Sequence, residues 1–321
     1  MNDWRPSASL QLIRQRAQLY RAIRAFFAVR EVMEVDTPVL SAAAVSDPYL
    51  QPMCSEFQGP GQNQGLPLFL QTSPEYAMKR LLAAGSGAIY QLAKSFRNGE
   101  SGRRHNPEFC MLEWYRPGFD AQQLMVEVEA LLLEVAGCGP AVKLSYRQAF
   151  QQYLGIDPHP ATAAQLQALA VERLDVDDMA LEDRDAWLDL LFSHLIEPEL
   201  QQPTFIYDYP ASQAALAQVS VDDSGALVAR RFELFINGLE LANGYLELVD
   251  AAEQASRFAG DQLKRQQMGL VPLPTDHHLV AALQAGMPDC AGVALGVDRL
   301  LMLISGCTHI DEVLPFPVSR A

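Results

Sequence analysis

The chain has 321 residues, of which 49% are hydrophobic, and this suits a globular enzyme with one large core or two medium ones. Its formal net charge is −15. Nucleic-acid-binding proteins usually concentrate lysine and arginine, because neutralising phosphates supplies much of their affinity. The charge therefore argues against stable binding of RNA and favours a neutral or basic macromolecular partner.

The amino-terminal residues are polar, and no apolar run is long enough to span a bilayer, so neither a signal peptide nor a membrane segment is predicted. The five cysteines are odd in number and none has C-x-x-C spacing, which favours reduced thiols over disulfides or a zinc site. These features predict a cytoplasmic protein.

The first third of the chain shows clear signals for helices and strands. Apolar residues at spacings of three and four predict a helix over 10–27, and a strand is expected over 31–40. Residues 58–67 are rich in turn formers and predict a loop or hairpin tip. Ser73 as N-cap and Pro74 as the first helical residue predict a helix that ends before Gly85.

The rest of the chain predicts hairpins with helices set apart. An antiparallel hairpin is expected from 88–96 and 109–115, around a polar loop over 97–108. The later expected elements are a helix over 120–136, a mainly helical and acidic insertion at about 140–203, strands at 204–207, 231–236 and 245–249, a helix over 251–268, and a closing short helix and Gly-rich strand–helix. The pattern predicts a single α+β domain over 1–321, with a mostly antiparallel sheet flanked by helices.

Three clusters of residues carry chemistry. The loop from Arg97 to Phe109 gathers three arginines, a histidine and two glycines, a set that can hold a polyphosphate, while Phe109 can stack on a base. A solvated basic loop is the alternative. The run from Gly292 to Arg299 combines small residues with an arginine at a helix start, where anions bind; tight helix packing would explain it as well.

The third cluster lies between Arg231 and Glu247. Glu233 and Glu240 interrupt an apolar stretch, and buried carboxylates are costly unless a cation or metal balances them. Magnesium bound by carboxylates and substrate phosphates would balance both. Solvent-facing positions on an edge strand are the alternative.

Together these clusters resemble the three signature motifs of class II aminoacyl-tRNA synthetases. Val35-Asp-Thr-Pro38 resembles motif 1, the arginine loop motif 2, and the Gly-rich run ending at Arg299 motif 3. Arg-His-Asn-Pro-Glu-Phe at 104–109 and Glu-x-x-Asn-Gly-Tyr-x-Glu at 240–247 are similar to the lysyl branch. The resemblance runs from about residue 10 to the carboxyl end and implies the class II catalytic fold.

The expected helix at residue 10 leaves no room for the amino-terminal anticodon-binding OB domain of lysyl-tRNA synthetases. With Leu-Glu-Trp-Tyr-Arg-Pro at 112–117 and the segment 287–299, the chain resembles the ligase family that attaches a (R)-β-lysyl group to a lysine of elongation factor P. This implies ATP-dependent activation of (R)-β-lysine or lysine to an aminoacyl-adenylate, and then an amide bond to the ε-amine of the protein lysine. It also implies a homodimer formed through motif 1, with Pro38 at the interface.

The resemblance assigns roles to individual residues. Arg97 and Arg299 are the expected catalytic residues, and Glu233 and Glu240 the expected magnesium ligands. The expected ATP-binding residues are Arg97, Asn98, Gly99, His105, Asn106, Phe109, Glu240, Leu241, Gly296 and Arg299. The expected substrate-binding residues are Ser73, Pro74, Glu75, Glu113, Tyr115, Asn243, Tyr245 and Glu247.

Several substrate residues also have structural interpretations. Ser73 and Glu75 are good helix-start residues, Glu113 and Tyr115 share a strand face as ordinary neighbours would, and Asn243-Gly244 could form a turn. Two positions depart from the synthetase pattern. Gly99 stands where motif 2 has a glutamate, followed by Glu100, which fits an acceptor other than tRNA.

Ala294 stands where lysyl synthetases have glycine in motif 3. One methyl group at a pocket wall changes substrate discrimination by roughly 10- to 200-fold. The hypothesis is that Ala294 disfavours α-lysine and suits the β-isomer.

Three other functions stay open at this point. They are a tRNA-charging enzyme, a ligase with a small-molecule amine acceptor, and a non-catalytic regulatory relative that binds ligand without turnover. The acidic run from Asp175 to Asp185 is either a docking site for a basic partner or a solvated helix face.

Overall fold

The computed structural model describes residues 4–174, 176 and 183–321. Its contacts separate two compact units. Unit 1 comprises Met1–Phe119, Glu134–Ala136 and Leu248–Ala321, and unit 2 comprises Asp120–Leu133 and Gly137–Glu247. Among the described residues, none of the helices combines the length and apolar character that crossing a bilayer requires.

Unit 1 begins with helix α1, Leu10–Ala28, which confirms the predicted helix. The Ser9 hydroxyl caps it by accepting a hydrogen bond from the Leu12 amide at 3.2 Å. The apolar stripe buries Ile23, Phe26 and Phe27 completely. Phe27 stacks on Tyr90 at a centroid distance of 4.3 Å, so the helix is fixed on the sheet of this unit.

The sheet of unit 1 is built around the predicted hairpin, which the structure confirms. Strand β5, Ile89–Phe96, pairs antiparallel with β6, Glu108–Pro117, and β6 pairs antiparallel with β12, Cys290–Gly296. The strand predicted over 31–40 is much shorter. Only β1, Met33–Glu34, pairs with β5, in parallel, and β2, Leu40–Ser41, joins a second sheet. Pro38 has no amide hydrogen and interrupts the run between them.

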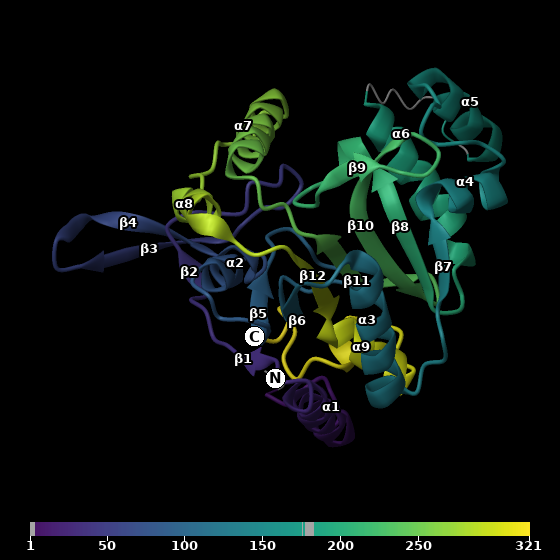
Figure 1. Cartoon of the computed structure of the whole chain (residues 1–321). Coiled ribbons are helices and arrows are strands. Elements are labelled where there is room, and N and C mark those ends of the chain that lie inside the picture. The colour runs from purple at the N-terminus through teal and green to yellow at the C-terminus, as the bar shows by residue number, and fades with distance from the viewer. Residues whose placement is uncertain (1–3, 175, 177–182) are drawn as a thin grey trace. The chain divides into compact units, whose positions relative to one another are not determined.

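The second sheet contains a long hairpin whose tip lies within residues 58–67, where a loop or hairpin tip was predicted. Strand β3, Cys54–Gly59, pairs antiparallel with β4, Gln62–Leu70, and β4 also pairs with β2 (Figure 1). The turn is shorter than its composition suggested. Gly61 has a φ of +81°, which lets the chain reverse within two residues.

Unit 1 also contains α2, Glu75–Ala83, α7, Ala251–Gln267, α8, His277–Gly286, and α9, Val297–Ser305. The N-cap of α2 is Pro74 and not Ser73 as predicted. The Ser73 hydroxyl still accepts a hydrogen bond from the Glu75 amide at 3.3 Å. Ser73, which precedes the N-cap, therefore provides an acceptor for the Glu75 amide, one of the amides of the first turn that have no partner within the helix.

The sheet of unit 2 consists of β7, Val142–Ser145, β8, Thr204–Pro210, β9, Val219–Val221, β10, Leu227–Ile236, and β11, Leu239–Leu246. Strand β7 runs parallel to β8, and the other pairs are antiparallel. The strand predicted at 245–249 is wrong, because β11 begins at Leu239. The turn before it is Asn237-Gly238, both with positive φ, whereas Asn243-Gly244 lies within the strand.

Helices pack on this sheet and confirm the helical character of 140–203. They are α4, Tyr146–Leu154, α5, Ala163–Arg173, and α6, Arg184–Leu191, and a π turn, Phe192–Ile196, and a 3₁₀ turn, Glu197–Glu199, follow α6. Before them, α3, Ala121–Ala136, confirms the helix predicted over 120–136. Tyr146, Phe192 and Tyr209 pack together in the core of the unit. Strand β7 is the exception to the helical prediction.

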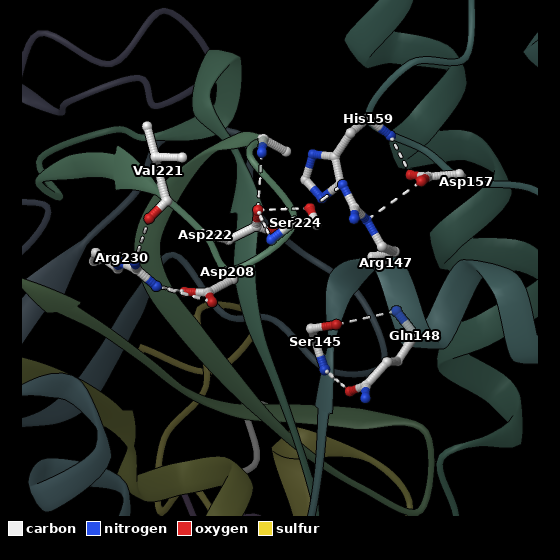
Figure 2. Close-up of polar contacts among 11 residues, drawn as sticks. Ser145, Arg147, Gln148, Asp157, His159, Asp208, Val221, Asp222, Ser224 and Arg230 are labelled. Atoms are coloured by element: carbon white, nitrogen blue, oxygen red, sulfur yellow. Dashed lines mark hydrogen bonds and ion pairs between the residues drawn. The ribbon is translucent and has the colours of Figure 1, made fainter.

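Ion pairs fasten the helical layer to the loop between β9 and β10. Arg147 of α4 lies 3.3 Å from the Asp157 carboxylate and 4.0 Å from that of Asp222 (Figure 2). The Asp222 side chain accepts hydrogen bonds from Ser224 and Ala226, which fix the loop itself. Of the acidic run from Asp175 to Asp185, residues 175 and 177–182 lie outside the described residues, so its predicted docking role stays untested.

Gly244 is required by packing. A Cβ atom there would lie 2.3 Å from the Phe232 ring, closer than atoms can approach. We expect Gly244→Ala to destabilise the protein by about 1–3 kcal/mol, because inserting a methyl group into a filled core forces its neighbours to move. Urea unfolding measures this change.

The matched control is Gly260→Ala in α7, where a Cβ atom would meet nothing within 4 Å. Alanine favours a helix over glycine by roughly 0.5–1 kcal/mol, so this variant should be as stable as the parent or more so. Equal losses in the two variants would contradict the packing argument.

Candidate active site

The loop between β5 and β6 is fixed at its base by backbone hydrogen bonds. The Arg97 amide donates to the Pro107 carbonyl at 2.9 Å, and the Asn98 amide donates to the Gln51 carbonyl at 2.8 Å. Gly99 adopts a φ of +83°, a conformation that glycine takes without strain. The predicted phosphate-binding residues therefore start from a hairpin whose base has a defined backbone conformation.

Asn106 holds the far side of the same loop. Its Oδ1 accepts from the Val318 amide at 3.0 Å, and its Nδ2 donates to the Glu108 carbonyl at 2.6 Å. The residue is buried, and both polar atoms of its amide are engaged within the protein. This geometry gives Asn106 a role in shaping the loop. The sequence motif predicted a contact with the nucleotide and could not separate that role from a structural one.

Arg97 and Phe109 are neighbours across the hairpin. The guanidinium carbon lies 5.1 Å from the centre of the Phe109 ring, and Arg97 is 3.7 Å from the Glu100 carboxylate. The Nε of Arg97 is buried and makes no hydrogen bond to the described part of the chain. The arginine thus keeps donor capacity that a phosphate oxygen could use.

His105 and Arg299 join the loop to α9. The Arg299 Nη2 lies 2.7 Å from the His105 Nε2. Arginine can only donate, so the histidine nitrogen accepts and the ring is neutral. Burial lowers the pKa of His105, and the nearby Arg299 lowers it further. Two predicted nucleotide-binding residues from different motifs, 194 positions apart in the sequence, are therefore in direct contact.

Gly296 is the N-cap of α9, and Arg299 lies in its first turn, as the sequence predicted. The backbone amides of a helix start are unpaired and favour an anion. A Cβ on Gly296 would lie 3.5 Å from the Arg299 side chain, an ordinary contact distance. The structure therefore leaves room for a methyl group at this position.

The residues predicted for one substrate amine surround the start of α2. Glu75 accepts a hydrogen bond from the buried Lys79 at 2.6 Å, an ion pair one helical turn apart. Pro74 is buried, and the Ser73 hydroxyl accepts a hydrogen bond from the Glu75 amide at the start of the helix. Both structural interpretations of Ser73 and Glu75 therefore hold, and they leave the predicted recognition role untested.

Glu113 and Tyr115 form a buried pair on β6. The Tyr115 hydroxyl donates to the Glu113 Oε1 at 2.6 Å, so the two residues are more than strand neighbours. In the sheet register, Glu113 faces Gln91 on β5 and Ala294 on β12. Ala294, the position where glycine was expected, therefore lies beside the carboxylate predicted to bind the distal amine.

In unit 2, a β-bulge brings the two predicted metal ligands to one face of the sheet. Leu234 pairs with Ala242 but Phe235 pairs with Glu240, so Leu241 is an extra residue. Without this bulge, Glu240 would face away from Glu233. Leu241 is buried. Burial raises the pKa of Glu233, Arg231 opposes this shift, and the nearby Glu240 charge adds to it.

Glu233 is surrounded by partners that the sequence analysis did not single out. Arg231 donates to its Oε1, and the Tyr209 hydroxyl donates to its Oε2 at 2.7 Å. The Arg231 guanidinium also lies over the Tyr209 and Tyr245 rings, 4.7 and 6.0 Å from their centres. An arginine two residues before a buried glutamate on a strand lies on the same face of the sheet. This spacing could have identified Arg231 as a partner of Glu233 from the sequence.

Asn243 completes this arrangement. Its Nδ2 lies 3.2 Å from the Glu233 Oε1, and a carboxylate paired with arginine can only accept. The amide oxygen therefore faces away from Glu233. It is buried and has no hydrogen-bond partner among the described residues, so it is available as an acceptor for a ligand.

The predicted residues therefore form two sets. Unit 1 holds Ser73, Pro74, Glu75, Arg97, Asn98, Gly99, His105, Asn106, Phe109, Glu113, Tyr115, Gly296 and Arg299. Unit 2 holds Glu233, Glu240, Leu241, Asn243, Tyr245 and Glu247, the last of these buried at the end of the sheet. Within the described part of the chain, no group of three or more metal-binding side chains is present, so Glu233 and Glu240 are at most a pair of ligands.

The contact between His105 and Arg299 predicts a measurable titration. We expect the pKa of His105 to lie below its ordinary value, and Arg299→Gln to move it upward, because one neighbouring cation is removed. Folding disfavours the charged ring, so its contribution to stability is complete above the ordinary pKa and declines as the pH falls. NMR titration of the ring protons measures the pKa, and His159 in unit 2 is the control that should not respond.

Comparison with known proteins places these observations in a family. The model for class II tRNA synthetases (D, K and N) matches residues 1–320. A protein of Vibrio vulnificus, "Elongation factor P--(R)-beta-lysine ligase", is 56% identical over 319 residues, 98% of each chain. Proteins with the same name from Vibrio cholerae and Salmonella arizonae are each 54% identical, over 100% and 99% of this chain and 99% and 98% of their own. The chain belongs to the class II tRNA synthetase family that comprises the D, K and N enzymes.

Proposed function

We propose that this chain activates (R)-β-lysine, or lysine, with ATP and transfers it to the ε-amine of a lysine on elongation factor P. Family membership makes it an ATP-dependent ligase. The single observation that supports the substrates is that relatives named for this reaction are 54–56% identical over nearly the whole chain. A tRNA-charging enzyme, a ligase with a small-molecule amine acceptor and a non-catalytic relative are the alternatives, and the transfer assay distinguishes them.

The first step of the proposed reaction forms the adenylate. A substrate carboxylate oxygen attacks the α-phosphorus of ATP, the bond to the bridging oxygen breaks, and pyrophosphate leaves. Arg97 grips the α-phosphate, and Arg299 stabilises the outer phosphates, with the neutral His105 beside it. Asn98, Gly99, Gly296 and Leu241 line the nucleotide, and Phe109 stacks on adenine. No side-chain nucleophile is needed, so catalysis consists of positioning and charge stabilisation.

The second step forms the amide. The neutral ε-amine of the acceptor lysine attacks the carbonyl carbon of the adenylate, AMP leaves with the bonding electron pair, and the amine loses a proton. The chain's acidity fits an acceptor with a basic surface better than a phosphate backbone. Stable tRNA binding is accordingly not part of this proposal.

The substrate pocket is proposed to recognise ammonium groups. Glu113, held by Tyr115, and Glu247 would accept from the distal amine, and Ser73, Pro74 and Glu75 would lie near the other amine. Tyr245 lines the pocket. The free oxygen of Asn243 supports this chemistry, because an amide oxygen accepts from an ammonium and repels a carboxylate.

Magnesium is proposed to bind through Glu233 and Glu240. A carboxylate has about four lone-pair sites, and Arg231, Asn243 and Tyr209 use three of those on Glu233, so one remains for a cation. Two carboxylates with substrate phosphates are a usual magnesium environment, and the ion would neutralise phosphate charge. We further propose that the protein is cytoplasmic and forms a homodimer through the segment around Pro38.

The position of Ala294 predicts the choice between lysine isomers. Its methyl group shares a sheet face with Glu113, so Ala294→Gly should enlarge the space beside the distal-amine site. We expect the ratio of kcat/KM for α-lysine to that for (R)-β-lysine to rise roughly 10-fold or more. Pyrophosphate exchange with each isomer measures it, and an unchanged ratio would remove Ala294 from isomer selection.

The proposed function is tested by ATP-dependent transfer of labelled (R)-β-lysine or α-lysine to purified elongation factor P. Bulk tRNA and free amines serve as parallel acceptors. We expect label on the protein, more with the β-isomer, and none on an elongation factor P that lacks its acceptor lysine. Label on tRNA alone would restore the synthetase function, and ATP binding without pyrophosphate exchange would indicate a non-catalytic relative.

A further inference from the structure

Asp298 is a buried carboxylate that joins two parts of the nucleotide site in unit 1. It precedes Arg299 in α9 and is 2% exposed. Its Oδ2 accepts from the Cys110 amide at 2.7 Å, and Cys110 follows Phe109 on β6. One side chain thus links the backbone beside the proposed phosphate-binding arginine to the backbone beside the proposed adenine-stacking ring.

The other oxygen of Asp298 is held by a residue 282 positions earlier. Arg16 of α1 donates from Nη2 to the Asp298 Oδ1 at 2.5 Å and to the Val313 carbonyl at 3.0 Å. The Arg16 side chain is 13% exposed, so the pair is largely shielded from water. A guanidinium in this position balances the buried charge of Asp298, and its second hydrogen bond, to Val313, fixes the direction of the guanidinium itself.

A second set of hydrogen bonds connects Arg16 to Cys110 through Tyr20. Arg16 Nη1 donates to the Tyr20 hydroxyl at 3.3 Å, and that hydroxyl donates to the Cys110 sulfur at 3.1 Å. Cys110 is therefore held through its amide by Asp298 and through its sulfur by Tyr20. Both paths begin at Arg16, so α1 adds side-chain restraints on Cys110 to those of the strand pairing at the start of β6.

From this geometry we infer that Arg16 is a positioning residue for ATP, acting through Asp298 on Arg299 and Phe109. The inference rests on the proposed function, because it assigns Arg299 and Phe109 to the nucleotide. Arg16 itself touches neither residue's side chain in the contacts described above. Loss of its guanidinium would leave the Asp298 charge buried without its cation, and the start of α9 would have to shift toward water.

The test compares Arg16→Gln with Arg24→Gln in the full chain, by pyrophosphate exchange with lysine as the donor. A misplacement of about 1 Å in a catalytic group can cost about 100-fold in rate, so we expect kcat/KM for ATP to fall roughly 10- to 100-fold in Arg16→Gln. The KM for the donor amino acid should stay within about two-fold of the parent value. Arg16 acts on the residues proposed to bind ATP, and the contacts proposed for the donor are unchanged.

Arg24→Gln is the matched control. Arg24 lies on the same helix and also pairs with a carboxylate, that of Glu34 at 3.0 Å, but both side chains are exposed, at 51% and 41%. Exposed ion pairs contribute little, so this variant should retain the parent's constants for both substrates. Arg16→Lys, which keeps the charge but has fewer donors, should recover part of the loss for ATP.

Tyr20→Phe tests this second set of hydrogen bonds without disturbing the buried ion pair. It removes the hydroxyl that connects Arg16 to Cys110, and we expect a smaller fall in kcat/KM for ATP, again with the donor KM unchanged. This variant keeps the inference testable if Arg16→Gln fails to fold, which thermal unfolding would reveal.

The outcomes separate this inference from the function it rests on. No pyrophosphate exchange by the parent protein with any lysine isomer would overturn the proposed function. An active parent with equal effects of Arg16→Gln on ATP and donor, or with Arg16→Gln equal to Arg24→Gln, would overturn the positioning role alone. A selective loss for ATP in Arg16→Gln and Tyr20→Phe supports it.

Discussion

A carboxylate removed from water must be met by a cation or by hydrogen-bond donors, and both units of this protein are organised around that constraint. In unit 1, Asp298 is met by Arg16 and a backbone amide, and Glu113 by the Tyr115 hydroxyl. In unit 2, Glu233 is met by Arg231 and Tyr209. These partners do more than balance charge, since each fixes the direction of an oxygen beside a residue proposed to bind substrate.

The elements with strong local signals were predictable from the sequence. The apolar period of α1 and the two β-rich runs around a polar loop gave a helix and a hairpin close to their observed bounds. Local signals failed where two segments compete for the same role. Both Asn237-Gly238 and Asn243-Gly244 can form a tight turn, and only pairing with β10 decides between them.

The sequence predicted which residues belong to the candidate site but not which of them are in contact. Motif spacing identified Arg97, His105 and Arg299, but the contact between the last two depends on long-range packing that no local pattern encodes. The bulge at Leu241 is another such feature, because a one-residue slip in register is needed to bring Glu240 to the face of Glu233. The supporting arginines Arg16 and Arg231 lacked any family motif to mark them.

The ion pair between Arg16 and Asp298 also bears on how the protein is made. It joins residues 282 positions apart, so it forms only after Asp298 has been synthesised. Closing so long a loop costs conformational entropy, and the formation of local helices and hairpins does not compensate this cost. A ribosome-bound or proteolytically shortened chain can therefore contain a folded α1 and a complete β5–β6 hairpin while its nucleotide residues are still unaligned. If Arg16 positions ATP as inferred, such incomplete chains lack the contact that aligns Arg299 and Phe109 and would not activate the amino acid.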